Sequence, residues 1–160
     1  GKLTTFRLIA LDALAAAKDN LPAAKEIIDD RMFLTPKIAA HALSPENTSW
    51  AQRLLGRYGD KAIELLNESS QDQQHNLDAT EFSLAECRWA IKYEAVEHLD
   101  DLLLRRTRLG MCLPNGGSNL YPALKDLFLS YQSWDEERWQ QEVNRYETIW
   151  TKYYSLPSNA

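Results

Sequence analysis

The sequence predicts an all-α protein, a helical bundle of about six or seven helices. Apolar residues recur three and four positions apart along most of the chain, which is the spacing of amphipathic helices. Two S-x-x-E patterns, Ser83 with Glu86 and Ser133 with Glu136, have the form of helix-starting capping boxes. No stretch reads convincingly as a strand, and no internal repeat is present.

The first predicted helix starts at Thr4 or Thr5 and ends before Pro22. Its apolar positions follow helical spacing, at Leu8, Ile9, Leu11, Leu14 and Ala15. Acidic residues and prolines then interrupt the pattern, so residues 19–48 are predicted to be a connector with at most a short helix over 37–42. The sequence is thereby divided into residues 1–18, the connector 19–48 and a helical domain, 49–160.

Two short helices are predicted to meet at Gly59, because apolar residues at helical spacing occupy both of its flanks. These residues are Trp50, Leu54, Leu55 and Tyr58 before it, and Ala62, Leu65 and Leu66 after it. The polar stretch 69–76 is predicted to be a surface loop. A long helix follows Ser83, with an apolar face formed by Leu84, Cys87, Ile91 and Ala95.

Three further helices are predicted, and a Pro-Asn-Gly-Gly loop at 114–117 lies between the first and the second of them. One runs from Leu99 or Asp100 to Gly110, one over 120–131, and the last starts after Ser133. The last helix carries an apolar stripe of Trp139, Val143, Tyr146, Ile149, Trp150 and Tyr153. This stripe suits core packing, a second subunit or a membrane. Core packing is favoured because the opposite, exposed face carries Glu137, Glu142 and Glu147 and is not rich in lysine.

Composition and charge exclude several classes of function. At 160 residues, with 44% hydrophobic and 26% charged residues, the chain fits one ordinary domain, and no apolar run approaches the roughly 18 residues of a membrane span. A net charge of -5 argues against a nucleic-acid partner. The two cysteines, Cys87 and Cys112, form no CxxC pair, which favours a reducing compartment. The three histidines are scattered, so no metal site is expected.

Three stretches resemble one known family. Residues 1–7, Gly-Lys-Leu-Thr-Thr-Phe-Arg, resemble a GGKLTTYR segment, with Phe6 where Tyr is usual. Residues 57–60, Arg-Tyr-Gly-Asp, resemble an RYG turn. Residues 84–95 and 102–110 resemble a run that ends in RRT-RLG. In this order they are similar to the C-terminal domain of the FAD-dependent (aerobic) glycerol-3-phosphate dehydrogenase and alpha-glycerophosphate oxidase family. The likeness extends to about Leu113 and is loose beyond Gly117.

The resemblance implies a fragment of a flavoenzyme of glycerol metabolism. The parent enzyme is expected to oxidise glycerol 3-phosphate to dihydroxyacetone phosphate, with FAD as cofactor and quinone or oxygen as the electron acceptor. The resemblance also implies that upstream FAD-binding and substrate domains of the same chain are its partners. The sequence does not begin with Met and enters a helical pattern at once, which is typical of a trimmed chain. The expected location is cytoplasmic, peripheral on the inner face of the membrane. Alone, the fragment is expected to be inactive and to bind no FAD. The alternative is a freestanding helical protein-interaction module.

The resemblance also assigns site residues near the first helix. Lys2 is the expected catalytic residue, and residues 1–5 are expected to contact the flavin: Gly1, Lys2, Leu3, Thr4 and Thr5. Unpaired N–H groups at a helix start carry partial positive charge, which suits a ring that gains negative charge on reduction. A lysine beside two threonines is also typical of an ordinary helix start.

The basic run Arg105, Arg106 and Arg108 has two interpretations. Guanidinium groups bind phosphate in a forked geometry, which favours a phosphate clamp. A structural role is favoured here, because Asp101 lies four residues before Arg105, and Glu94 or Asp100 is within reach of Arg106. At least one of these two arginines is expected to be buried against such an acid.

Overall fold

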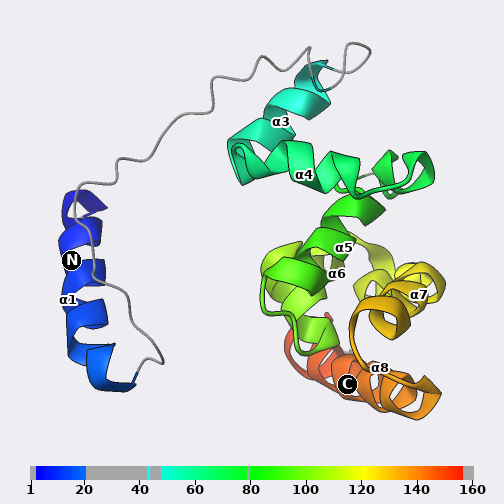
Figure 1. Cartoon of the computed structure of the whole chain (residues 1–160). Coiled ribbons are helices and arrows are strands. Elements are labelled where there is room, and N and C mark those ends of the chain that lie inside the picture. The colour runs from blue at the N-terminus through cyan, green and yellow to red at the C-terminus, as the bar shows by residue number, and fades with distance from the viewer. Residues whose placement is uncertain (1–2, 21–42, 44–47, 79, 157–160) are drawn as a thin grey trace. The chain divides into compact units, whose positions relative to one another are not determined.

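A computed structural model describes residues 3–20, 43, 48–78 and 80–156. The chain divides into two compact units, Gly1–Thr35 and Pro36–Ala160. The described residues contain seven α-helices and no strand, apart from one isolated bridge between Asn76 and Ser83 (Figure 1). The all-α prediction is confirmed. The helix expected over 37–42 lies outside the described residues.

The described part of the first unit, residues 3–20, is helical throughout. A 3-10 turn, η1 (Leu3–Thr5), leads into α1 (Phe6–Ala17), which continues into η2 (Lys18–Asn20). None of the residues of α1 is buried, and the exposed fraction is 51% for Phe6 and 63% for Leu8. A helix that is apolar around most of its circumference normally packs inside a larger body. Large apolar side chains of α1, such as Leu8 and Ile9, are therefore exposed in the described part of the chain.

The second unit begins with a helical hairpin. Helices α3 (Thr48–Tyr58) and α4 (Lys61–Asn67) meet at Gly59, as predicted. Gly59 has a φ of +61°, a left-handed conformation that glycine adopts without a Cβ penalty. Its amide donates to the Leu55 carbonyl at 2.9 Å, which closes the last turn of α3.

The polar stretch 69–76 is exposed or half-buried but is not wholly irregular. It contains a short 3-10 helix, η3 (Gln71–Gln74), and Ser70 with Gln73 forms a capping box there. The sequence prediction missed this element because the stretch has too few apolar residues for a periodic pattern.

Helix α5 (Leu84–Tyr93) starts at the predicted capping box. The Ser83 amide donates to Glu86 Oε2 at 2.9 Å, and both residues are fully buried. The prediction that Ala95 belongs to the apolar face of this helix is wrong, because α5 ends at Tyr93. Ala95 has a φ of +52° and is exposed in the turn that follows.

The helix predicted from Leu99 or Asp100 to Gly110 is two elements. A π-helical segment, η4 (Asp101–Arg106), is followed by α6 (Leu109–Cys112), with Arg108 between them at a φ of +58°. Thr107 explains the break: its hydroxyl donates to the Leu102 carbonyl at 2.7 Å and accepts from the Leu109 amide at 3.3 Å. A side chain that satisfies backbone groups in this way competes with a continuous helix.

The loop at 114–117 belongs to a 3-10 segment, η5 (Pro114–Leu120), which leads into α7 (Tyr121–Tyr131). Helix α8 (Glu136–Tyr153) follows. Its N-cap is Asp135, whose side chain accepts from the Arg138 amide at 2.8 Å. The predicted capping box of Ser133 with Glu136 is therefore wrong: Asp135 lies nearer the first free amides and takes the position.

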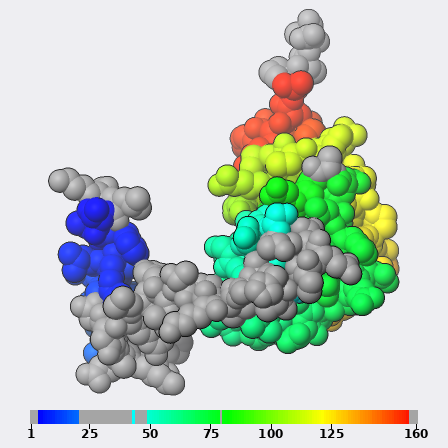
Figure 2. Space-filling model, turned by 90° about the horizontal axis from the view of Figure 1, so that it is seen from above, coloured from blue at the N-terminus to red at the C-terminus, as the bar shows by residue number. Residues whose placement is uncertain are grey.

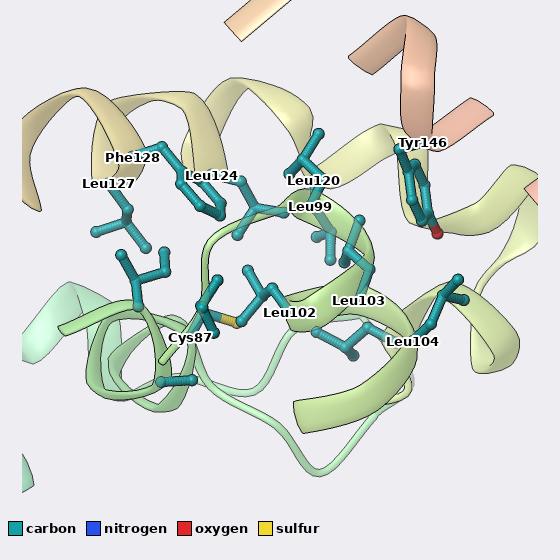
Figure 3. Close-up of a cluster of buried hydrophobic side chains, with 14 of the residues drawn as sticks. Cys87, Leu99, Leu102, Leu103, Leu104, Leu120, Leu124, Leu127, Phe128 and Tyr146 are labelled. Carbon is teal, nitrogen blue, oxygen red and sulfur yellow. The ribbon is translucent and has the colours of Figure 1, made fainter. Parts of the chain in front are cut away.

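One large apolar cluster holds α5, η4, α6, α7 and α8 together (Figure 3). Its fully buried members include Cys87, Leu99, Leu102, Leu103, Leu124, Phe128 and Tyr146. The stripe of α8 packs into this cluster, with Trp139, Val143 and Tyr146 buried. Core packing is thus confirmed for most of the stripe, whereas Tyr153 remains 66% exposed. In Figure 2 the end of α8, in red, lies beside the yellow-green atoms of the segment that contains α6.

Candidate functional site

The predicted flavin-contacting residues lie at the start of the first unit. Gly1 and Lys2 are outside the described residues, so their positions stay predictions. Thr4 is exposed, and Thr5 occupies the N-cap position of α1. The first turn of α1 contains no acidic residue. Its partial positive charge is therefore not offset by a carboxylate of that turn, and the helix start is compatible with an anionic or electron-rich group.

Two of the pockets among the described residues differ in size and shape. One, of about 140 Å³, is lined by Ser49, Trp50, Arg53, Asn76 and Glu81. The other, of about 540 Å³, is a shallow, open depression on α8, lined by Asn144, Glu147, Thr148, Thr151 and Lys152. Typical small-molecule sites measure about 300–1,000 Å³ and enclose most of the ligand, which an open depression does not do. Among the described residues, no group of three or more His, Cys, Asp or Glu side chains is placed to hold a metal ion.

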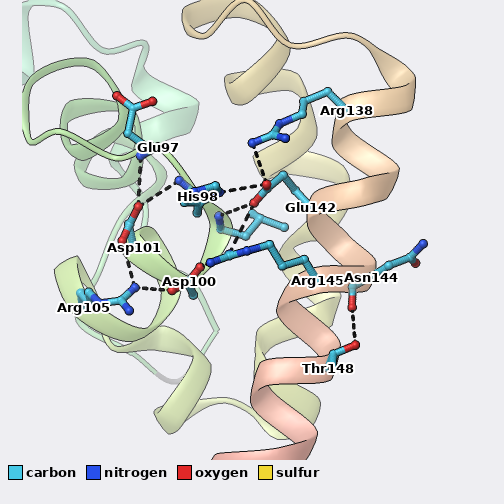
Figure 4. Close-up of polar contacts among 11 residues, drawn as sticks. Glu97, His98, Asp100, Asp101, Arg105, Arg138, Glu142, Asn144, Arg145 and Thr148 are labelled. Atoms are coloured by element: carbon cyan, nitrogen blue, oxygen red, sulfur yellow. Dashed lines mark hydrogen bonds and ion pairs between the residues drawn. The ribbon is translucent and has the colours of Figure 1, made fainter.

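A charge network joins η4 to α8 (Figure 4). Asp100, almost fully buried, forms ion pairs with both Arg105 and Arg145. Arg105 also lies 2.9 Å from Asp101, four residues earlier, at the spacing noted in the sequence. Burial would raise the pKa of Asp100, but hydrogen bonds from Arg145 and Arg105 outweigh it and lower the pKa below its usual value.

The expectation of a buried arginine in this run is wrong. Arg105 is 62% exposed, and Arg106 is exposed as well. The buried partner is the acid, Asp100, because it lies between η4 and α8 whereas the arginine side chain reaches in from the surface. Neither Glu94 nor Asp100 forms an ion pair with Arg106 within the described part of the chain.

Glu142 is the centre of the network and was missed by the sequence prediction, which assigned it to the exposed face. It is buried. Its carboxylate forms an ion pair with Arg138 Nη2 at 2.8 Å, lies 2.9 Å from His98 Nδ1 and accepts a hydrogen bond from the Leu99 amide at 3.4 Å. The available signal was the pair of arginines on the same helix, Arg138 four residues before and Arg145 three after. These contacts attach α8 to the turn before η4, which is a structural role.

Another buried acid connects two of the family-like stretches. Glu86, on α5, is fully buried and forms an ion pair with Arg53 of α3. Tyr58 Oη donates to Glu86 Oε1 at 3.2 Å. Burial, and next the nearby charge of Glu86, raise the pKa of Tyr58 well above its usual value, so its phenol stays protonated. The stretch 57–60 is thus fixed to the stretch 84–95.

Arg57 connects the third stretch. Its Nη2 donates to the Arg106 carbonyl, its Nε donates to Tyr58 Oη at 3.1 Å, and its guanidinium lies 4.7 Å from the centre of the Phe82 ring. Residues 57–60, 84–95 and 102–110 therefore meet within the second unit. Arg108 is exposed beside this junction in sequence, and no ion pair in the described segments involves it or Arg106.

A third ion cluster lies on the opposite end of α5 from its capping box. Arg88 is buried and lies 3.0 Å from Glu68, which also accepts from Lys92 at 2.9 Å and from Tyr93 Oη at 2.8 Å. Hydrogen bonds from Lys92, then Tyr93 and Arg88, lower the pKa of Glu68 to about 2. This cluster fixes the end of α4 to α5. This cluster could not be predicted from the sequence, because Glu68 lies 20 residues from Arg88 and 24 from Lys92.

Comparisons with known proteins agree on one family. Residues 16–139 match the family described as the C-terminal domain of alpha-glycerophosphate oxidase. The chain is 28% identical over 160 residues to "Glycerol-3-phosphate dehydrogenase 2" of Mycobacterium tuberculosis and of Mycobacterium bovis, and 29% identical to "Glycerol-3-phosphate dehydrogenase" of Mycobacterium leprae. These matches cover 91% of the chain and 27% of each relative, so the chain spans about a quarter of their length. No solved structure matches it.

Proposed function

Because this chain belongs to the family of the C-terminal domain of alpha-glycerophosphate oxidase, we propose that it is the C-terminal helical part of an FAD-dependent glycerol-3-phosphate dehydrogenase. The parent enzyme would oxidise glycerol 3-phosphate to dihydroxyacetone phosphate and pass the electrons to quinone. The match over residues 16–139 carries this proposal, and the relatives named glycerol-3-phosphate dehydrogenase support it.

The first unit provides the structural support. Helix α1 has no buried residue, although Leu8, Ile9 and Leu14 are all large and apolar. Leaving such side chains in water costs about 1.5–3 kcal/mol for each one that a partner would otherwise bury. Packing against the upstream flavin-binding part of a longer chain removes that cost.

Residues 1–5 would be this chain's contribution to the flavin site. When bound, FAD supplies the acceptor for the hydride that leaves the substrate carbon. The amides of residues 3–5 and the start of α1 would face the electron-rich edge of the ring, and Lys2 would place a full positive charge there. The remaining described residues, from Thr48 onward, would support the catalytic body and touch no reacting atom.

The proposed location is cytoplasmic, at the inner face of the membrane, because the quinone acceptor resides in the bilayer. None of the described helices is both long and apolar enough to cross a membrane. Contact with the bilayer would therefore come through the surface of the parent enzyme or through residues outside those described.

The deciding experiment assays the full-length parent protein with glycerol 3-phosphate and an artificial electron acceptor. We expect bound flavin in its absorbance spectrum and bleaching of that flavin by substrate. The 160-residue chain alone serves as the control, and we expect it to be helical by circular dichroism, colourless and inactive. A full-length protein without flavin, or with flavin that the substrate does not reduce, would refute the proposal and favour a helical interaction module.

A further inference from the structure

We draw no further inference here: the strongest candidate, the exposed apolar patch of Tyr153, Tyr154 and Leu156 at the C-terminal end of α8, carries none, because nothing in the described part of the chain shows what covers it.

Discussion

Replacing Gly110 by alanine tests the tightest contact in the core. A Cβ at this position would lie 2.2 Å from Tyr146 Oη, 3.1 Å from Leu104 Cδ2 and 3.3 Å from the Gly116 carbonyl oxygen. Tyr146 is fully buried and donates to that same carbonyl at 2.7 Å, so it cannot move without breaking the bond. The Gly110 carbonyl in turn accepts from Trp150 Nε1 at 2.8 Å. Gly110 therefore marks a place where α8 closely approaches α6.

The expected loss can be estimated from these contacts. Overpacking a core costs about 1–3 kcal/mol, and leaving the buried tyrosine hydroxyl and its carbonyl unpaired costs about 1–3 kcal/mol more. Alanine also gives the unfolded chain less conformational entropy than glycine does, which offsets about 0.4–1 kcal/mol of this destabilisation. We expect Gly110→Ala to destabilise the second unit by about 2–4 kcal/mol, which lowers the melting temperature by roughly 10 °C. Thermal unfolding followed by circular dichroism measures it.

The chain provides its own control. Gly56 lies exposed within α3, and an added Cβ there meets nothing within 4 Å. Gly56→Ala should therefore stabilise by about 0.5–1 kcal/mol. Tyr146→Phe removes the clashing hydroxyl, so the double variant with Gly110→Ala should be at least about 1 kcal/mol more stable than the sum of the two single effects predicts. Additive effects, or a neutral Gly110→Ala, would refute the proposed packing.

Three further predictions concern single side chains. The depressed pKa of Glu68 contributes stability that is fully present above the usual carboxyl pKa of 4.5 and is lost as the pH falls toward 2. Glu68→Gln should thus flatten the fall in melting temperature between pH 5 and pH 2.5 and lower the melting temperature at pH 7. Asp135→Ala should cost about 1 kcal/mol in urea unfolding through loss of the N-cap of α8, whereas Ser133→Ala should change little. In the full-length protein, Lys2→Met should slow flavin reduction by glycerol 3-phosphate roughly a hundred- to thousandfold in stopped-flow measurements and lower the flavin midpoint potential. Wild-type reduction rates would place Lys2 outside the site.

Features set by local chemistry were predictable from the sequence. The capping box at Ser83 and Glu86, the turn at Gly59 and the apolar stripe of α8 each depend on residues within a few positions of one another. Where two residues suit the same role, or two patterns place a helix end differently, the sequence does not show which of them the structure adopts. Asp135 and Ser133 both suit an N-cap, and Thr107 ended a helix whose apolar periodicity continued to Gly110.

Features set by long-range packing were not predictable. Glu142 has the sequence context of a surface residue, and its burial follows from the approach of His98 and Leu99, which lie more than 40 positions away. The same reason explains why the acid and not the arginine is buried in the pair of Asp100 and Arg105. Which end of an ion pair is buried depends on the element that packs over it, and here that element is α8.

The contacts of the family-like stretches bear on how mutations in them would act. Glu86, Thr107 and Gly110 each make buried contacts that fix one helix to another, and none of them faces a pocket described here. Substitutions at these positions change the population of folded protein rather than the chemical step, so they should lower the amount of active enzyme in a cell while leaving the turnover of each bound flavin unaltered. Substitutions at Lys2 should do the opposite, since a residue at a helix start contributes little packing. Measuring activity per flavin alongside total flavin separates the two classes. An equal loss of turnover per flavin in Gly110→Ala would mean that the helical domain shapes the reaction site directly.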